Sequence, residues 1–168
     1  MQVNFCFDGS QLLGTAGAIK KALPLLGESF FVLYGDSYLL CDYQKIQRNF
    51  EQSGRLGLMT IFRNEGLWDQ SNVEFTNGKI CDYNKKNNTP RMNHIDYGLG
   101  VFQKNAFSSV PDGRPQDLAQ VYQDLLRKGE LAAYEVPDRF YEIGSLPGLE
   151  ELRRFLASRS NAESEKLL

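Results

Sequence analysis

The chain has 168 residues, of which 42% are hydrophobic and 24% charged, enough for one globular domain with a substantial core. Its net charge of −2 gives no electrostatic basis for binding nucleic acid or an anionic membrane. No apolar run approaches the roughly 20 residues of a membrane-spanning helix, and the N-terminus has no basic and apolar regions of a signal peptide. These features predict a cytoplasmic protein that binds neither nucleic acid nor a membrane.

The first part of the chain predicts a strand, a helix and a second strand. Residues 3–7 alternate between apolar and polar types and end at a turn, which predicts a strand. Thr15 is expected to cap a helix that runs to about Leu26, with Pro24 shortening or kinking its end. Residues 30–34 form a continuous apolar run, the pattern of a strand buried on both faces. Two strands separated by one helix indicate a parallel, right-handed unit.

The rest of the chain alternates between helical and extended patterns, with an antiparallel portion in the middle. In chain order, the sequence predicts a helix capped by Asp42 that runs through Phe50, a strand at 56–62, a hairpin of 72–75 and 79–83 with a primed turn at Asn77-Gly78, a strand at 95–102, an amphipathic helix at 115–128, strands at 131–136 and 140–143, and a helix at 146–156. The expected product is a single α/β domain over residues 1–157 with a mixed sheet. A polar, flexible tail is expected at 158–168.

Three cysteines are an odd number, and none has CxxC spacing. This argues against structural zinc and favours a reducing compartment. Cys6 and Cys81 stand among alternating apolar residues, where a free cysteine is expected to behave as a small hydrophobic side chain.

Asp36 is the strongest candidate for a functional residue. It follows Gly35 directly after the apolar run at 30–34, and open α/β sheets bind ligands at the carboxyl ends of their strands. A carboxylate there is a hard oxygen ligand that suits Mg²⁺. The same Gly-Asp-Ser sequence also suits a plain strand-ending turn, so the pattern alone leaves both interpretations open.

Other candidates each have a functional and a structural interpretation. Residues 13–17 open a helix whose N–H groups could bind a nucleobase edge or a phosphate, although the sequence alone favours a helix cap with close helix–sheet packing. Glu142 is either a second metal-binding carboxylate or a residue favoured near the following helix N-terminus. Lys85 and Lys86 could neutralise a sugar phosphate or simply be solvated. His94 has no Ser or Cys motif beside it, which favours a structural role over a catalytic triad.

Five segments occur in an order and spacing that resembles a known enzyme family. They are Leu13-Gly14-Thr15-Ala16-Gly17-Ala18, Val32-Leu33-Tyr34-Gly35-Asp36, Tyr83-Asn84-Lys85, Ile95-Asp96-Tyr97-Gly98-Leu99-Gly100-Val101-Phe102 and Tyr141-Glu142-Ile143-Gly144-Ser145. Together they resemble the sugar-1-phosphate nucleotidyltransferases, the nucleotide-sugar pyrophosphorylases, over nearly the whole chain. Among relatives, the chain looks most similar to bacterial enzymes that activate hexose or heptose 1-phosphates for surface polysaccharide.

The resemblance implies a Rossmann-like mixed sheet and a reaction that joins a nucleoside triphosphate (NTP) to a sugar 1-phosphate with release of pyrophosphate. Such an in-line attack needs positioning and charge neutralisation rather than a protein nucleophile. The implied roles are Mg²⁺ binding for Asp36 and Glu142, catalysis for Asp36 and Lys85, sugar binding for Lys85 and Gly98, and nucleotide binding for Gly14, Thr15, Tyr34 and Gly35.

The chain also departs from the family pattern. Asn84 stands where relatives usually carry a sugar-binding Glu, and Glu142 stands where many carry Asp. Relatives begin with a strand, a Gly-rich loop that ends in a basic residue, and a further Lys. The chain starts after these parts, which indicates an N-terminally truncated fold with an exposed sheet edge.

Because losing one preorganised donor costs on the order of 10²–10³ in rate, we expect the 168-residue polypeptide to turn over poorly or not at all. The alternative is a non-catalytic remnant that binds a nucleotide or sugar phosphate. The same alternative includes a partner subunit that forms a homo-oligomer or pairs through the exposed edge.

Overall fold

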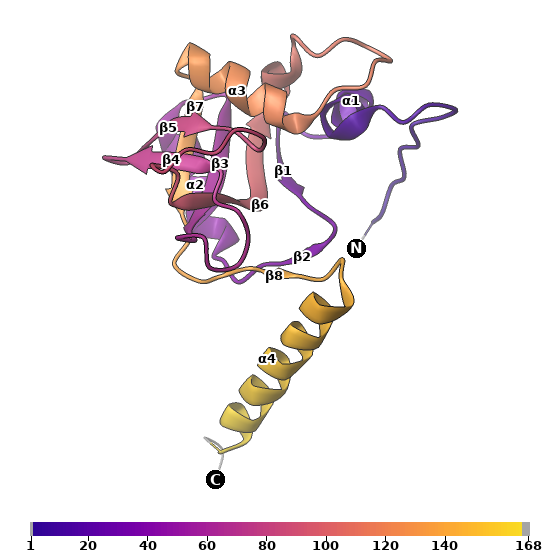
Figure 1. Ribbon diagram of the computed structural model, residues 1–168. Helices are drawn as coiled ribbons and strands as arrows, with labels where there is room; N and C mark the ends of the chain where they lie inside the picture. The colour runs from indigo at the N-terminus through magenta and orange to yellow at the C-terminus, as the bar shows by residue number, and fades with distance from the viewer. Residues whose placement is uncertain (1, 166–168) are drawn as a thin grey trace.

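A computed structural model describes residues 2–165, and Met1 and residues 166–168 lie outside the described part. A six-stranded mixed sheet carries helices on both of its faces (Figure 1). The helices α1 (Gly14–Ala22) and α3 (Leu118–Lys128) contribute to the core on one face, and α2 (Tyr43–Ser53) contributes to the core on the other. The helix α4 (Leu146–Glu165) extends away from the sheet. The predicted α/β fold with a mixed sheet is confirmed.

The strand β6 organises the sheet because it pairs along both of its edges. The strands of the sheet are β1 (Ser29–Leu33), β3 (Gly57–Arg63), β4 (Val73–Thr76), β5 (Lys79–Tyr83), β6 (His94–Gln103) and β7 (Leu131–Glu135). One edge of β6 pairs antiparallel with β3, and the other edge pairs antiparallel with β4 at its start and β1 at its end. The strand β3 also pairs in parallel with β7, and β4 pairs with β5.

Two short strands and two single turns of 3-10 helix complete the fold. The strands β2 (Ser37–Tyr38) and β8 (Tyr141–Glu142) form a separate antiparallel pair. The turns are η1 (Leu23–Leu25) and η2 (Lys104–Phe107). Among the described residues, no helix is both long and apolar enough to cross a bilayer.

Local signals fix the ends of two helices and the hairpin turn. The Asp42 carboxylate accepts the Lys45 N–H at 3.0 Å and starts α2, as predicted. The helix ends at Gly54, whose φ of 62° is easily adopted by glycine. Asn77 and Gly78 have φ values of 53° and 75°, which confirms the predicted primed turn between β4 and β5.

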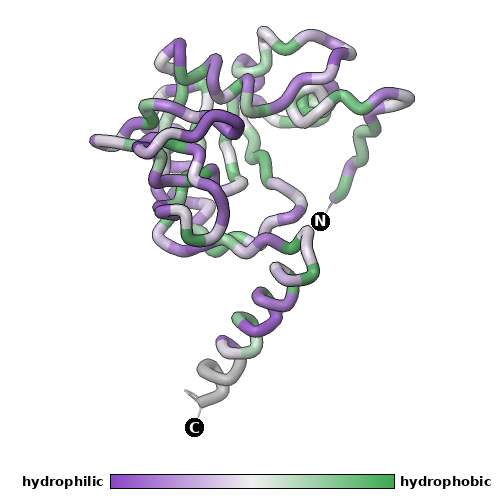
Figure 2. The backbone as a smooth tube through the Cα atoms, viewed as in Figure 1, coloured by the Kyte–Doolittle hydropathy of each residue, from purple (hydrophilic) through white to green (hydrophobic). Residues whose placement is uncertain are grey.

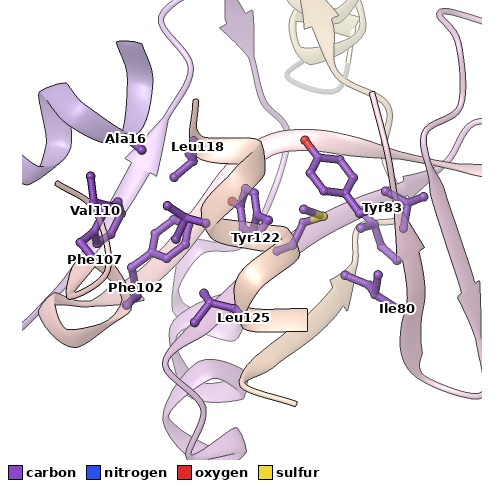
Figure 3. Close-up of a cluster of buried hydrophobic side chains, with 14 residues drawn as sticks. Ala16, Ile80, Tyr83, Phe102, Phe107, Val110, Leu118, Tyr122 and Leu125 are labelled. Atoms are coloured by element: carbon purple, nitrogen blue, oxygen red, sulfur yellow. The ribbon is translucent and has the colours of Figure 1, made fainter. Parts of the chain in front are cut away.

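The larger core lies between the sheet and the helices α1 and α3 (Figure 3). The rings of Phe102 and Tyr122 are fully buried there, with centroids 5.1 Å apart. Phe107 packs on Phe102 at 5.3 Å, edge to face. A second, smaller core of Ile46, Phe50, Leu58, Leu99 and Val101 joins α2 to the opposite face of the sheet.

Gly100→Ala is expected to destabilise the protein. A Cβ atom at Gly100 would overlap the Tyr122 hydroxyl oxygen and lie 2.8 Å from Phe102 Cε2. Because both rings are fully buried, we expect the free energy of unfolding to fall by about 1–3 kcal/mol, the usual cost of overpacking. Urea unfolding measures the change. Gly35→Ala is the control, since a Cβ at Gly35 meets nothing within 4 Å, and an equal loss in both variants would contradict the packing argument.

The predicted parallel strand–helix–strand unit at the N-terminus is wrong. Residues 3–7 form no strand, and the side chains of Phe5 and Phe7 are 76% and 77% exposed. Figure 2 shows this hydrophobic stretch outside the packed body of the chain. The apolar alternation suits a strand, but within residues 2–165 no neighbouring strand pairs with it.

The expectation that residues 30–34 are buried on both faces is also wrong. Phe31 and Leu33 in β1 are 37% and 50% exposed. The strand β1 pairs with β6 alone, and within residues 2–165 its other edge has no partner strand. The predicted exposed sheet edge is therefore present in the described part of the chain.

Three smaller expectations are corrected. Leu13, not Thr15, occupies the N-cap of α1. The helix ends at Ala22 rather than near Leu26, and the expected shortening at Pro24 is confirmed, since Pro24 lies in the turn η1 that starts at Leu23. Cys6 and Cys81 are exposed rather than packed as small hydrophobic residues. Cys6 lies in a segment that forms no strand, and Cys81 lies on the exposed face of β5, whose Ile80 and Tyr83 are buried.

The last helix is longer than predicted. α4 continues to Glu165 and so includes most of the segment 158–168 that is predicted as a tail. Exposed ion pairs of Glu150 with Arg153 and Arg154 have the spacing that supports a helix in this region. The division into a domain at 1–157 and a flexible tail stays a prediction, and its last residues, 166–168, lie outside the described part.

Candidate functional site

Two clefts meet at the C-terminal end of β1. One, the apolar cleft, has a volume of about 650 Å³ and lies between α1 and β1, with Ile19 and Val32 in its walls. The other, the polar cleft, has a volume of about 350 Å³ and is lined by residues such as Ser37, Asn72 and Gly98. Three residues, Tyr34, Asp36 and Lys85, line both clefts. A ligand that extends from one cleft into the other would therefore pass a carboxylate, an ammonium group and an aromatic ring.

Asp36 and Glu142 come together because β2 pairs with β8. In this pair Ser37 lies opposite Glu142, and the Ile143 N–H donates to the Asp36 carbonyl oxygen at 2.8 Å. A Cβ atom at Gly144 would lie 2.6 Å from Glu142 Oε1 and 3.9 Å from Asp36 Oδ2. Both carboxylates therefore face the same small space beside Gly144, and both residues are exposed.

This donor set fits Mg²⁺ bound together with phosphates. Within residues 2–165, no group of three or more His, Cys, Asp or Glu side chains gathers as a metal cage. Mg²⁺ usually takes only one or two carboxylates and completes its shell with water and substrate phosphates. The Ser145 hydroxyl donates to Glu142 Oε2 at 2.6 Å and accepts the Gly148 N–H at 3.2 Å, so it orients this carboxylate.

Lys85 is carried on a loop that Asn84 organises. The Asn84 Oδ1 atom accepts the backbone N–H groups of Lys86 and Asn87, each at 2.9 Å. The Lys85 Nζ atom lies 5.3 Å from the centroid of the Tyr34 ring, in the range of a cation–π contact. Asn84, the departure from the family pattern, thus shapes the loop that presents Lys85 to the clefts.

Asp96 is a functional candidate that the sequence interpretation missed. Its Oδ2 atom accepts the hydroxyl groups of Tyr34 at 3.0 Å and Tyr83 at 3.1 Å, and Oδ1 accepts the Gly98 N–H at 3.1 Å. Burial raises the pKa of the Asp96 carboxyl, while these hydrogen bonds and the charge of Lys85 act against the rise. A carboxylate near the start of a strand whose following residues are almost all apolar was the available signal.

The glycine-rich start of α1 is used for packing. A Cβ atom at Gly14 would lie 2.7 Å from the Gln116 carbonyl oxygen, which also accepts the N–H groups of Ala16 and Gly17 at 2.9 and 3.4 Å. The Thr15 hydroxyl accepts the Leu118 N–H at 2.7 Å. Two of the N–H groups predicted to meet a ligand are thus already bonded.

The structure brings most of the predicted site residues together. The polar cleft contains Tyr34, Asp36, Lys85, Gly98 and Glu142, and the apolar cleft adds Thr15 and Gly35. Gly14 is not among the residues that line either cleft. Gly98, with a φ of 89°, forms part of the polar wall, where a Cβ atom would lie 3.3 Å from Tyr34 Cδ2 and 3.4 Å from Ser37 Oγ.

The sequence interpretation also missed the loop at residues 64–71, which brings Asp69 and Gln70 to the polar cleft. The buried Asn64 side chain donates to the Asp69 carbonyl oxygen at 2.6 Å and holds the loop. The Arg139 guanidinium lies 3.4 Å from the centroid of the Trp68 ring and also bonds to Glu151 on α4 at 2.9 and 3.0 Å. The loop therefore forms a braced wall of the cleft. No local motif marks this contact.

No protein-family model matches the chain. Many solved structures are similar to it, among them those of three proteins. One is a Bacillus anthracis protein assigned as a glucose-1-phosphate thymidylyltransferase and crystallised with sucrose, at 16% identity and TM-score 0.72 over 82% of this chain and 58% of that one. Another is HddC from Yersinia pseudotuberculosis complexed with GMP-PN, at 19% identity and TM-score 0.67 over 84% and 62%.

The third similar structure is the inositol-1-phosphate CTP transferase of T. maritima, at 20% identity and TM-score 0.64 over 81% of this chain and 58% of that one. The chain therefore spans about three-fifths of the length of these proteins. The resemblance of its fold to that of sugar-phosphate nucleotidyltransferases is confirmed.

Proposed function

We propose that this site serves nucleotidyl transfer between an NTP and a sugar 1-phosphate. The observation that carries the proposal is the wall of Tyr34, Asp36 and Lys85 that an apolar and a polar cleft share. The apolar cleft suits a nucleobase, and the polar cleft suits a sugar. Phosphate groups that join the two would lie beside Asp36 and Lys85, where charge must be neutralised during in-line attack.

Each residue has a role in this proposal. Asp36 and Glu142 hold Mg²⁺, which neutralises the phosphate charge when it is bound. Lys85 binds the phosphate of the sugar, and Gly98 lines the sugar pocket, where its lack of a side chain lets Tyr34 and Ser37 approach closely. Thr15, Tyr34 and Gly35 border the nucleotide. For Gly14 we infer an indirect role, because it allows the close packing of α1 against the backbone at Gln116.

Binding and turnover by the 168-residue chain test the proposal separately. In the presence of Mg²⁺, calorimetry should detect the binding of an NTP and the binding of a hexose 1-phosphate to the chain. Both binding signals should weaken when EDTA removes the metal. Pyrophosphate release should be slow, because residues 2–165 carry no Gly-rich loop for a triphosphate. Failure to bind either ligand would contradict the proposed function. Rapid release would contradict only the expected impairment.

A second candidate function is that of a non-catalytic binding or partner subunit, either as a homo-oligomer or by edge pairing. The observation that favours it is the edge of β1 that has no partner strand within residues 2–165, together with the exposed side chains of Phe31 and Leu33. An exposed, apolar strand edge is a template for another strand. In this arrangement the clefts would bind ligand without completing the reaction.

Phe31→Lys is expected to reduce self-association through this edge. A lysine on an edge strand opposes pairing because the added strand would have to desolvate its charge. Sedimentation velocity across a concentration series should show a smaller associated fraction than in the wild type. Leu67→Lys is the control, because Leu67 is exposed in the loop at residues 64–71, away from β1. An equal effect of both changes would argue against pairing through β1.

The cellular setting is also proposed. We infer that the chain acts in the cytoplasm and helps to make nucleotide sugars for polysaccharide synthesis. The free state of all three cysteines supports a reducing compartment. The resemblance to hexose- and heptose-activating enzymes supports the link to polysaccharides.

A further inference from the structure

Asp96 connects the core of the protein to the candidate site. Among residues 2–159 it is the only buried carboxylate. Two tyrosine hydroxyl groups donate to the same atom, Oδ2, but the two rings lie in different surroundings. Tyr34 lines both clefts, whereas Tyr83 packs edge to face on Tyr122 in the core, with centroids 5.8 Å apart.

The contact with Tyr34 continues to Lys85. The Tyr34 hydroxyl donates to Asp96 Oδ2 at 3.0 Å, so this hydrogen bond fixes the ring at the wall of the two clefts. A phenol that donates to a carboxylate gains electron density in its ring, and an electron-rich ring attracts a cation more strongly. The Lys85 ammonium lies over this ring.

We propose, on the basis of the function inferred above, that Asp96 is a positioning residue that sets the place of the Lys85 ammonium by fixing and polarising the Tyr34 ring. Asp96, Tyr34 and Lys85 form a relay from a buried negative charge to an exposed positive one. The relay places the ammonium at the junction of the two clefts before a sugar phosphate arrives. Preorganisation of this kind improves affinity because less freedom is lost on binding.

The chain offers a matched pair of variants to test the relay. Tyr34→Phe and Tyr83→Phe each remove one hydroxyl that donates to Asp96 Oδ2, but only Tyr34 touches the clefts. Asp96→Asn removes the charge with little change in shape. Urea unfolding of each variant measures its stability separately from its effect on the site.

The first readout needs no ligand. Reductive methylation with ¹³C-formaldehyde labels the lysines, and Lys85→Arg identifies the Lys85 signal in the ¹H–¹³C spectrum. The Tyr34 ring should displace this signal upfield of the signal of exposed Lys86. We expect Asp96→Asn and Tyr34→Phe to move it toward the Lys86 position and Tyr83→Phe to leave it in place. If Asp96→Asn does not fold, the two tyrosine variants still decide the question.

The second readout is the affinity of the chain for glucose 1-phosphate, used as the probe, in the presence of Mg²⁺. Asp96→Asn and Tyr34→Phe should each weaken binding by about fivefold to tenfold, and Tyr83→Phe should have less than about a twofold effect. In the Tyr34→Phe background, Asp96→Asn should add little, because both changes break the same relay.

An unchanged Lys85 signal in both Asp96→Asn and Tyr34→Phe would overturn the proposal. An equal change in Tyr83→Phe would also overturn it, since a general loss of core packing would then explain the effect. If the signals move as expected while the wild type binds no glucose 1-phosphate, the relay stands and the proposed function fails for this sugar.

Discussion

Asp36→Asn is expected to abolish the Mg²⁺-dependent binding of an NTP. Asp36 and Glu142 are the two carboxylates that face the space beside Gly144, so the change removes one of the two protein carboxylates proposed to bind the metal. Removing a residue that only orients a ligand already weakens metal binding by about 10- to 100-fold, so we expect a loss of at least about 100-fold here. Calorimetry with Mg²⁺, repeated in EDTA, measures the metal-dependent part.

The fold should survive this substitution. The contact that ties the segment after β1 to β8 uses the Asp36 backbone carbonyl, which accepts the Ile143 N–H, and the side chain is exposed. Glu142→Gln should weaken binding in the same direction, with its Ser145 contact retained through the amide oxygen. Glu65→Gln is the control. The Glu65 carboxylate lies in the loop after β3 and pairs with Arg63, the last residue of that strand. Wild-type Mg²⁺ dependence in Asp36→Asn would refute the metal assignment.

Features that depend on neighbouring residues could be predicted from the sequence. Asp42 caps its helix and Asn77-Gly78 forms its turn because each interaction closes within a few residues. The burial of β1 could not be predicted in this way. An apolar run shows that a strand can be buried on both faces, but burial also requires neighbouring strands, and β1 pairs with β6 alone within residues 2–165.

The candidate site shows the same division. The sequence pattern indicated Asp36, Lys85 and Glu142 as candidates, the family resemblance implied their roles, and the structure brings them to the same polar cleft. The hydrogen bonds of Asp96 to Tyr34 and Tyr83 join three different segments, so no local pattern could indicate them.

Gly14 shows that a motif can be recognised in the sequence while the group it contacts stays unknown. Small residues at a helix start are compatible with a ligand and with close packing, and only the position of Gln116 distinguishes the two. A motif can therefore identify a residue as special without identifying what it meets.

Lys85→Ala is expected to weaken the binding of a hexose 1-phosphate by about 10- to 100-fold. A charge-assisted hydrogen bond contributes about 1.5–3 kcal/mol, and the loss of that free energy lowers affinity by this factor. Lys85 lines both clefts and lies over Tyr34, so its ammonium can reach a phosphate placed between them. Affinity for the uncharged hexose should change little, because the variant removes a phosphate contact only. Calorimetry with both sugars separates the phosphate contribution.

Lys86→Ala provides a matched control at the next position. Both lysines are exposed and carry the same charge, and the backbone N–H of Lys86 bonds to Asn84, a contact that alanine retains. Since general attraction of an anion to the loop would depend on both lysines, equal losses in the two variants would exclude a specific Lys85 contact. Lys85→Arg should keep part of the affinity because it keeps the charge but changes the geometry of the donor. A loss confined to Lys85→Ala, with partial recovery in Lys85→Arg, therefore identifies a positioned ammonium group rather than a diffuse field.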